Sequence, residues 1–353
     1  MNNEKESVLQ NSGLIDAPPL EEDYIAGATS QLGFNRVKED ADWRDLRQPG
    51  ERQKASRIET MSCVSFSENN VAEIHFERQR RAGEIPASTM RELEALGYVV
   101  DGRLNLSDRF LAWASGTTKQ GNYMNKVAQT LREVGAVPEA DWPFINAPWD
   151  EFYKEPPQWV KDKAKKFLEF FQVSYEWVSV SVNPQSKAYI RIHLKQAPLQ
   201  VALATCSPWD SEVGFCGRAG TNHAVTLLHL DENGVATIFD SYDPYTKVLS
   251  ADYPIPSVLK TVITLKQPEQ MNARFIYVKN KPEQYVELNG KKKSVRELPS
   301  KEDLADFFDI PLEPVEISQE YLDKLVDKGR FPSKRFHDLV DPEAADIFGV
   351  NVG

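Results

Sequence analysis

The chain has 353 residues, of which 41% are hydrophobic and 10% aromatic, so it can bury the core of one large domain or of two smaller ones. Its formal net charge of -11 at pH 7 argues against nucleic acid as a main partner, because phosphate binding requires a basic surface. No stretch approaches the roughly 18 apolar residues of a membrane helix, so we expect no membrane association.

The first 40 residues are acidic and show no apolar periodicity. Pro18 and Pro19 lie in the middle of this segment, and prolines disfavour both helix interiors and central strands. The pattern predicts an extended N-terminal arm over residues 1–40. The polar stretch from Met1 to Asn11 lacks the apolar run of a secretory signal, so we expect the protein to stay in the cytoplasm of the cell that produces it.

Four segments after the arm have apolar residues at the spacing of helices with one buried side. In the first segment these positions include Cys63, Phe66 and Ile74. Gly135 ends the third segment, because glycine readily adopts the backbone conformation that follows a helix. The predicted helices are Cys63 to Ala82, Glu84 to Leu96, Asn122 to Val134 and Trp159 to Phe171.

The segments that follow are rich in β-branched residues or alternate between apolar and polar positions, as strands do. The turn sequence from Asp231 to Gly234 predicts a hairpin between two of them. The predicted strands are Tyr175 to Val182, Gln200 to Thr205, His223 to Leu230, Val235 to Phe239 and Val262 to Leu265. A helical half followed by a strand-rich half indicates an α+β fold with two lobes and a cleft between them.

A break at Gln267-Pro268-Glu269-Gln270 separates the last part of the chain. The tight-turn pair Asn289-Gly290 predicts a hairpin beyond this break. The predicted strands are Phe275 to Lys279, Gln284 to Leu288 and Ser294 to Leu298, and the predicted helices are Lys301 to Phe308, Gln319 to Val326 and Pro342 to Phe348. We therefore expect an arm at 1–40, a main domain at 41–267 and a small hairpin and helix extension at 268–353.

Three residues have the types and the order that cysteine-nucleophile chemistry requires. Cys63 opens the first predicted helix, His223 lies 160 residues later, and Asp240 follows after another 17. A helix N-terminus and a nearby imidazolium both favour the reactive thiolate, and a third group must hold the imidazole in place. The pattern predicts that these residues are the nucleophile, the general base and the orienting group.

The other two cysteines leave two alternatives open. Cys206 and Cys216 either pair across a loop or remain free thiols, and three cysteines are too few for a secreted disulfide scaffold. No CxxC or HExxH spacing is present, so we expect neither a metal site nor another cofactor.

Several motifs occur in an order that resembles the papain family of cysteine peptidases. They are Asp42-Trp43-Arg44, Ser62-Cys63-Val64-Ser65-Phe66-Ser67, Gly121-Asn122-Tyr123-Met124, Gly214-Phe215-Cys216-Gly217 and Asn222-His223-Ala224-Val225. The resemblance extends from about Asp42 to Leu265. It implies a papain-like two-lobed α+β fold, with a helical lobe and an antiparallel β-barrel-like lobe.

The resemblance also implies roles for individual residues. Asp240 stands where the family usually has the orienting asparagine, and Tyr242 stands where a tryptophan shields the histidine. The oxyanion glutamine of the family lies six residues before the cysteine, where this chain has Arg57. Gln53 is the nearest glutamine and is the oxyanion candidate if the intervening loop is longer than usual. The substrate-cleft candidates are Gly121, Asn122, Asn222 and Tyr242.

The expected function is hydrolysis of peptide bonds in polypeptide substrates by Cys63, His223 and Asp240. The segment from Glu59 to Cys63 resembles divergent bacteriophage and bacterial members of the family. An alternative is therefore a weak or inactive papain-fold component of a phage particle, which docks other particle proteins through its arm and C-terminal extension. A third alternative is a hydrolase of cell-wall peptides, which uses the same chemistry.

Overall fold

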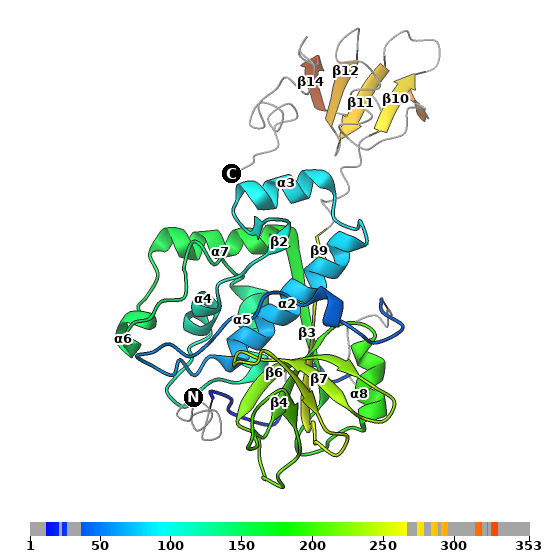
Figure 1. Ribbon diagram of the computed structural model, residues 1–353. Helices are drawn as coiled ribbons and strands as arrows, with labels where there is room; N and C mark the ends of the chain where they lie inside the picture. The colour runs from blue at the N-terminus through cyan, green and yellow to red at the C-terminus, as the bar shows by residue number, and fades with distance from the viewer. Residues whose placement is uncertain are drawn as a thin grey trace. The chain divides into compact units, whose positions relative to one another are not determined.

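The computed structural model describes residues 12–20, 23–26 and 37–266, together with residues 274–278, 284–288, 291–295, 315–319, 323 and 326–330. The chain divides into two compact units, Met1–Lys266 and Gln267–Gly353. The first unit combines helices with a large sheet (Figure 1). Within the described residues no helix is long and apolar enough to cross a membrane.

The central element of the first unit is the helix α2, Cys63–Arg81, which crosses the middle of the unit (Figure 1). It contacts the strands β6 and β9 as well as other helices, and most of its residues are buried, among them polar ones such as Glu68 and Asn69. The remaining helices are η1 Arg44–Leu46, α3 Ala87–Ala95, α4 Asp108–Ala114, α5 Met124–Glu133, α6 Trp149–Phe152, α7 Gln158–Phe170 and α8 Lys187–Leu194.

The sheet of the first unit has seven strands in the order β3-β9-β4-β6-β7-β8-β5. Their bounds are β3 Phe171–Ser179, β4 Leu199–Leu203, β5 Glu212–Val213, β6 His223–Leu230, β7 Ala236–Phe239, β8 Thr246–Leu249 and β9 Ser257–Leu265. All neighbouring pairs are antiparallel except β5 and β8. Phe239, the last residue of β7, pairs with Thr226 of β6, so the residue after β7 lies near the start of β6.

Two apolar clusters fill the first unit. One contains Trp43, residues of α8 such as Leu194, and side chains of β6 such as Leu227. The other contains Cys63 and Ala224, together with residues from α5, α7 and β3. Because α2 and the start of β6 contribute to both clusters, these two elements lie where the helical part meets the sheet.

The predicted α+β class is confirmed, and among the described strands the sheet is open rather than a closed barrel, with β3 and β5 at its edges. The predicted start of a strand at Tyr175, after a helix that ends at Phe171, is wrong. The helix α7 ends at Phe170, and the strand β3 begins directly at Phe171 with no loop between them. Phe171 and Val173 are buried while Gln172 is exposed, which is the alternation of a strand. A two-stranded sheet joins β1 Val99–Val100 to β2 Arg103–Leu104.

The second unit contains a five-stranded sheet in the order β13-β10-β11-β12-β14. The bounds are β10 Arg274–Val278, β11 Gln284–Leu288, β12 Lys291–Val295, β13 Val315–Ile317 and β14 Val326–Arg330. The predicted strand from Ser294 begins too late, because Lys291 already pairs with Leu288 directly across the hairpin. The predicted helix to Val326 is wrong at its end, since that residue opens β14. The helices predicted at Lys301 to Phe308 and Pro342 to Phe348 lie outside the described residues.

Gly135 allows a close approach between the end of α5 and α7. Its φ is +87°, and an added Cβ would lie 2.0 Å from the carbonyl oxygen of Ala164. We expect Gly135→Ala to lower the free energy of unfolding by about 2 to 4 kcal/mol, from left-handed strain and displaced backbone. Gly102→Ala is the control, because Gly102 has φ +74° with nothing within 4 Å of the added atom, and should cost only about 1 to 2 kcal/mol. Equal urea midpoints for the two variants would contradict this account.

Candidate active site

Cys63 is the first residue of α2 and is completely buried. Its Sγ accepts a hydrogen bond of 3.4 Å from the backbone N–H of Ala224 on β6. The first N–H groups of a helix have no partner within the helix and carry its positive end. The fold therefore places the thiol at a helix N-terminus and against the sheet strand that begins with His223.

His223 and Asp240 are brought together by the pairing of β6 with β7. His223 opens β6, and its Nε2 lies 2.6 Å from Oδ1 of Asp240. The other carboxylate oxygen, Oδ2, accepts a hydrogen bond from Nε1 of Trp209 at 2.8 Å. All three side chains are buried. The carboxylate therefore holds the imidazole through one ring nitrogen and leaves Nδ1 directed elsewhere.

Aromatic rings enclose this imidazole on two sides. The ring of Tyr242 meets that of His223 edge to face at 5.5 Å, and the ring of Trp209 does so at 5.8 Å. Burial by itself would raise the pKa of Asp240, but the charges and hydrogen bonds of His223 and Lys247 outweigh it and hold that pKa below its usual range. Asp240 is thus ionised at neutral pH.

The structure brings Gln53 to the same site. The two N–H groups of its Nε2 are shared among three acceptors, the carbonyl oxygen of Ser12 at 2.9 Å, Glu59 Oε1 at 2.8 Å and the hydroxyl of Tyr242 at 2.9 Å. Its Oε1 accepts a hydrogen bond from the hydroxyl of Ser241 at 2.7 Å, and the Ser12 carbonyl, which can only accept, fixes the orientation of the amide. Arg57, at the family's position for this glutamine, is exposed.

The described arm residues from Ser12 to Ile15 lie beside His223 and Asn122. The hydroxyl of Ser12 is 2.6 Å from Nδ1 of His223 and donates to the carbonyl oxygen of Asn222 at 3.0 Å. A hydroxyl can both donate and accept, so Ser12 contacts the ring nitrogen and the Asn222 carbonyl at the same time. Ser12 is completely buried, so the arm occupies the ring nitrogen that a reacting thiol needs.

The arm continues along Gly121 and Asn122 as a short parallel pairing. The N–H of Asn122 donates to Gly13 at 2.8 Å, and the N–H of Ile15 donates to Asn122 at 2.9 Å. Leu14, between them, is buried in the same apolar cluster as Cys63. The substrate-cleft candidates Gly121 and Asn122 thus bind an extended strand in this structure, and that strand belongs to the chain itself.

Close packing of two glycines allows this arrangement. A Cβ on Gly13 would lie 2.1 Å from the carbonyl oxygen of Met61, and one on Gly121 would lie 2.1 Å from that of Gly13. Both glycines have φ of +109°, in the region that side chains disfavour. Any residue other than glycine at position 13 is therefore incompatible with the seated arm.

In this structure Cys63 lies in an environment that favours its neutral thiol form. Burial raises the pKa of Cys63, the charges of Glu59 and Asp240 raise it further, and the N–H of Ala224 only partly offsets them. A neutral thiol is a weak nucleophile. The structure therefore shows a closed arrangement, in which Cys63 is buried and its neutral form is favoured.

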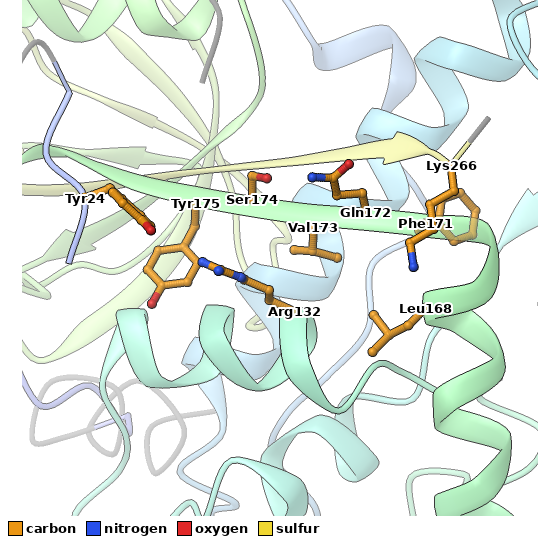
Figure 2. Close-up of a pocket in the computed structure, with 9 residues that line it drawn as sticks. All are labelled: Tyr24, Arg132, Leu168, Phe171, Gln172, Val173, Ser174, Tyr175 and Lys266. Carbon is orange, nitrogen blue, oxygen red and sulfur yellow. The ribbon is translucent and has the colours of Figure 1, made fainter. Parts of the chain in front are cut away.

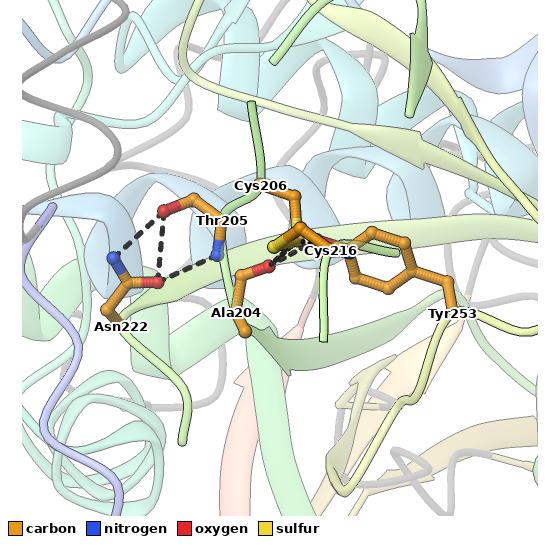
Figure 3. The surroundings of a disulfide bond; sticks show 6 residues. All are labelled: Ala204, Thr205, Cys206, Cys216, Asn222 and Tyr253. Atoms are coloured by element: carbon orange, nitrogen blue, oxygen red, sulfur yellow. Dashed lines mark hydrogen bonds between the residues drawn. A yellow bond between two sulfur atoms is a disulfide. The ribbon is translucent and has the colours of Figure 1, made fainter. Parts of the chain in front are cut away.

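Cys206 and Cys216 form a disulfide bond (Figure 3), which decides between the two alternatives that the sequence left open. The bridge lies in the loop that leads from β4 to His223. In the same loop Asn222 Oδ1 accepts hydrogen bonds from the N–H and the hydroxyl of Thr205, and the N–H of Asn222 donates to Leu203. Asn222 is thus a structural support for the residue that follows it and presents its carbonyl to the arm.

The structure also identifies site residues that the sequence analysis missed. These are Ser12, Glu59, Trp209 and Lys247. Ser12 and Trp209 reach the site because segments distant in the sequence fold against it, whereas Glu59 and Lys247 lie within a few residues of Cys63 and Asp240. Only Lys247 could have been noticed in the sequence, because it is a lysine within the alternating segment after Asp240, and the structure places it at a fully buried position.

Among the described residues no three or more His, Cys, Asp or Glu side chains are grouped so as to hold a metal ion. A cavity of about 270 Å³ lies along β3, between the ends of α5 and α7 and Tyr24 of the arm. Figure 2 shows its lining, which includes Arg132 and Tyr175 but neither Cys63 nor His223.

Comparison with known proteins gives matches only among solved structures. No protein-family model and no curated protein matches the chain. Xylellain, a cysteine protease from Xylella fastidiosa, is 13% identical over 72% of this chain and 95% of its own, with a TM-score of 0.49. Procathepsin L 3 from the larval midgut of Tenebrio molitor is 15% identical over 73% of this chain and 79% of its own, with a TM-score of 0.49. Bromelain from Ananas comosus is 15% identical over 63% and 97%, with a TM-score of 0.42. These identities do not assign the chain to a family.

Proposed function

We propose that the protein is a papain-like cysteine peptidase whose N-terminal arm closes its active site. The observation that carries the proposal is that three groups lie around the start of β6, linked by contacts through Ala224, Ser12 and Tyr242. These are the thiol of Cys63 at a helix N-terminus, the imidazole of His223 held at 2.6 Å by Asp240, and the side-chain amide of Gln53. Nucleophile, base and oxyanion donor are the parts that acyl transfer requires.

The seated arm indicates how a peptide substrate binds. The Ser12 carbonyl accepts a hydrogen bond from Gln53 Nε2, as the carbonyl of a scissile peptide bond would. When the arm leaves, Nδ1 of His223 is free to take the proton of Cys63. The thiolate then attacks the substrate carbonyl, His223 returns the proton to the leaving amine, and a water molecule activated by His223 releases the acyl group.

Selective labelling of Cys63 tests this proposal. Cys206 and Cys216 are bonded to each other, so iodoacetamide has a single thiol to modify. In a chain whose arm is displaced, we expect Cys63 to react at pH 6 at least about tenfold faster than in the unfolded chain, because a paired thiolate forms well below the ordinary thiol pKa. His223→Gln should remove this acceleration.

As a control, the arm-displaced chain and its His223→Gln variant are both labelled in 6 M urea, where they should react at the same rate. If the folded, arm-displaced chain reacts no faster than the unfolded chain, or if His223→Gln reacts equally fast, Cys63 is not an activated nucleophile.

A second candidate is a papain-fold protein that does not catalyse, such as a structural component of a phage particle. The arm buried in the cleft is the observation that favours it, because such an arm also suits a protein in which the cleft serves only to bind a strand. The presence of Gln53 beside Tyr242 favours the peptidase instead. Peptide hydrolysis by the arm-displaced chain separates the two, and comparison of casein with cell-wall peptides as substrates tests the third candidate, a cell-wall peptide hydrolase.

A further inference from the structure

A buried lysine contacts the carboxylate that holds the imidazole. Nζ of Lys247 lies 2.9 Å from Asp240 Oδ2 and donates to the carbonyl oxygens of Tyr242 at 2.6 Å and Pro244 at 2.5 Å. Its side chain is completely buried, and the ammonium lies 5.6 Å from the centre of the Trp209 ring. A lysine without solvent contact is uncommon unless its charge is paired.

The two carboxylate oxygens of Asp240 have separate tasks. Oδ1 receives the N–H of His223, whereas Oδ2 receives the ammonium of Lys247 and the indole N–H of Trp209. Three donors on one carboxylate leave it no freedom to rotate. The pair formed by Asp240 and Lys247 has no net charge, so the imidazole faces an oxygen acceptor whose charge is largely cancelled behind it.

We propose that Lys247 is a positioning residue that acts through Asp240: it fixes the carboxylate and cancels its charge, so that this aspartate serves His223 as a neutral amide would. This inference rests on the proposed function, because it explains how an aspartate replaces an asparagine beside a histidine that must both take and return a proton. A lone buried carboxylate would bind the imidazolium too tightly to let it release that proton near neutral pH.

The groups that face His223 come from four segments. Asp240 follows β7 and Lys247 lies on β8; Cys63 approaches from α2. Glu59 acts at longer range, through its contact with Gln53 and its charge near Cys63. Tyr242 is held in its neutral form, because burial raises its pKa. Among these groups only Lys247 opposes the anionic charge beside the imidazole.

The test is an NMR titration of the His223 ring in the full-length chain carrying Cys63→Ser, which removes the coupled thiol. We expect Lys247→Met to raise the pKa of His223 by about one to two pH units and Asp240→Asn to lower it by about one to three. Asp240→Asn/Lys247→Met, which removes both charges, should return it to within about half a unit of the parent. The signal is assigned by its loss in His223→Gln.

A His223 pKa that stays unchanged or falls in Lys247→Met overturns the proposal. If Lys247→Met does not fold, the comparison of the double variant with Asp240→Asn decides, because the double variant must then titrate at least about one unit higher, and equality overturns the proposal. In the chain with its arm displaced, the apparent pKa on the alkaline side of the kcat/KM profile should rise in Lys247→Met and fall in Asp240→Asn. The NMR shifts require no turnover, so a chain that shows them but hydrolyses no peptide contradicts the proposed function and not the role of Lys247.

Discussion

Gly13→Ala is expected to release the arm and to raise the rate of Cys63 alkylation by about 100-fold or more. The added Cβ would lie 2.1 Å from the Met61 carbonyl oxygen, at a backbone φ of +109°, so the arm cannot seat without moving. Left-handed strain costs about 1 to 2 kcal/mol, and each hydrogen bond lost from the arm about 1 kcal/mol. A loss of about 2.7 kcal/mol in arm affinity corresponds to a 100-fold larger open fraction.

The alkylation rate of the native protein at low iodoacetamide concentration measures this effect. Pro18→Ala is the matched control, because Pro18 lies in the same arm and is exposed, and it should leave the rate within about twofold. Leu14→Asp provides a second route to the same open state, since it places a carboxylate in the apolar cluster around Cys63. If neither variant accelerates labelling, the arm does not control access to the thiol.

Gln53→Ala is expected to lower kcat for peptide hydrolysis by about 10²- to 10³-fold, the usual cost of one oxyanion donor. The effect is measured in the Gly13→Ala chain, so that the arm does not mask it. KM should change little, because the hydrogen bond strengthens as charge develops on the oxygen. Iodoacetamide labelling of Cys63 should stay within about threefold, since alkylation forms no oxyanion.

Two variants make the Gln53 experiment specific. Arg57→Ala changes the residue that stands six positions before the cysteine, whose side chain is exposed, and should leave kcat within about twofold. Gln53→Glu keeps the size of the side chain but loses its donor N–H groups, so it should resemble the alanine variant. If Arg57→Ala lowers the rate of hydrolysis and Gln53→Ala does not, Gln53 is not the oxyanion donor.

Periodicity and turn signals were sufficient for much of the fold. The first helix was predicted from Cys63 and the structure has it at Cys63–Arg81, and the strands at His223–Leu230 and Gln284–Leu288 were predicted with their bounds. These segments have strong local patterns. The short elements α4, α8 and β8 were not predicted, because helices of seven or eight residues complete only about two turns, and the buried Lys247 breaks the apolar alternation of β8.

The residues of the candidate site also differ in how far local sequence patterns could predict them. Cys63, His223 and Asp240 could be named from the order of local motifs, and the structure brings His223 and Asp240 to 2.6 Å. Gln53 was uncertain because it lies ten residues before Cys63 rather than the six that the resemblance implies, and its position depends on contacts with Ser12 and Ser241. The pairing of Cys206 with Cys216 was open because spacing does not determine whether two cysteines meet.

The sequence by itself determined the class of fold and the three residues that suit cysteine chemistry, because periodicity and motif order are local properties of the chain. Only the tertiary structure decided that Ser12 occupies Nδ1 of His223 and that Lys247 backs Asp240. Ser12 and His223 are 211 positions apart. Contacts of this kind depend on how several segments pack at once, and no short stretch of sequence encodes where a distant arm or a buried charge will lie.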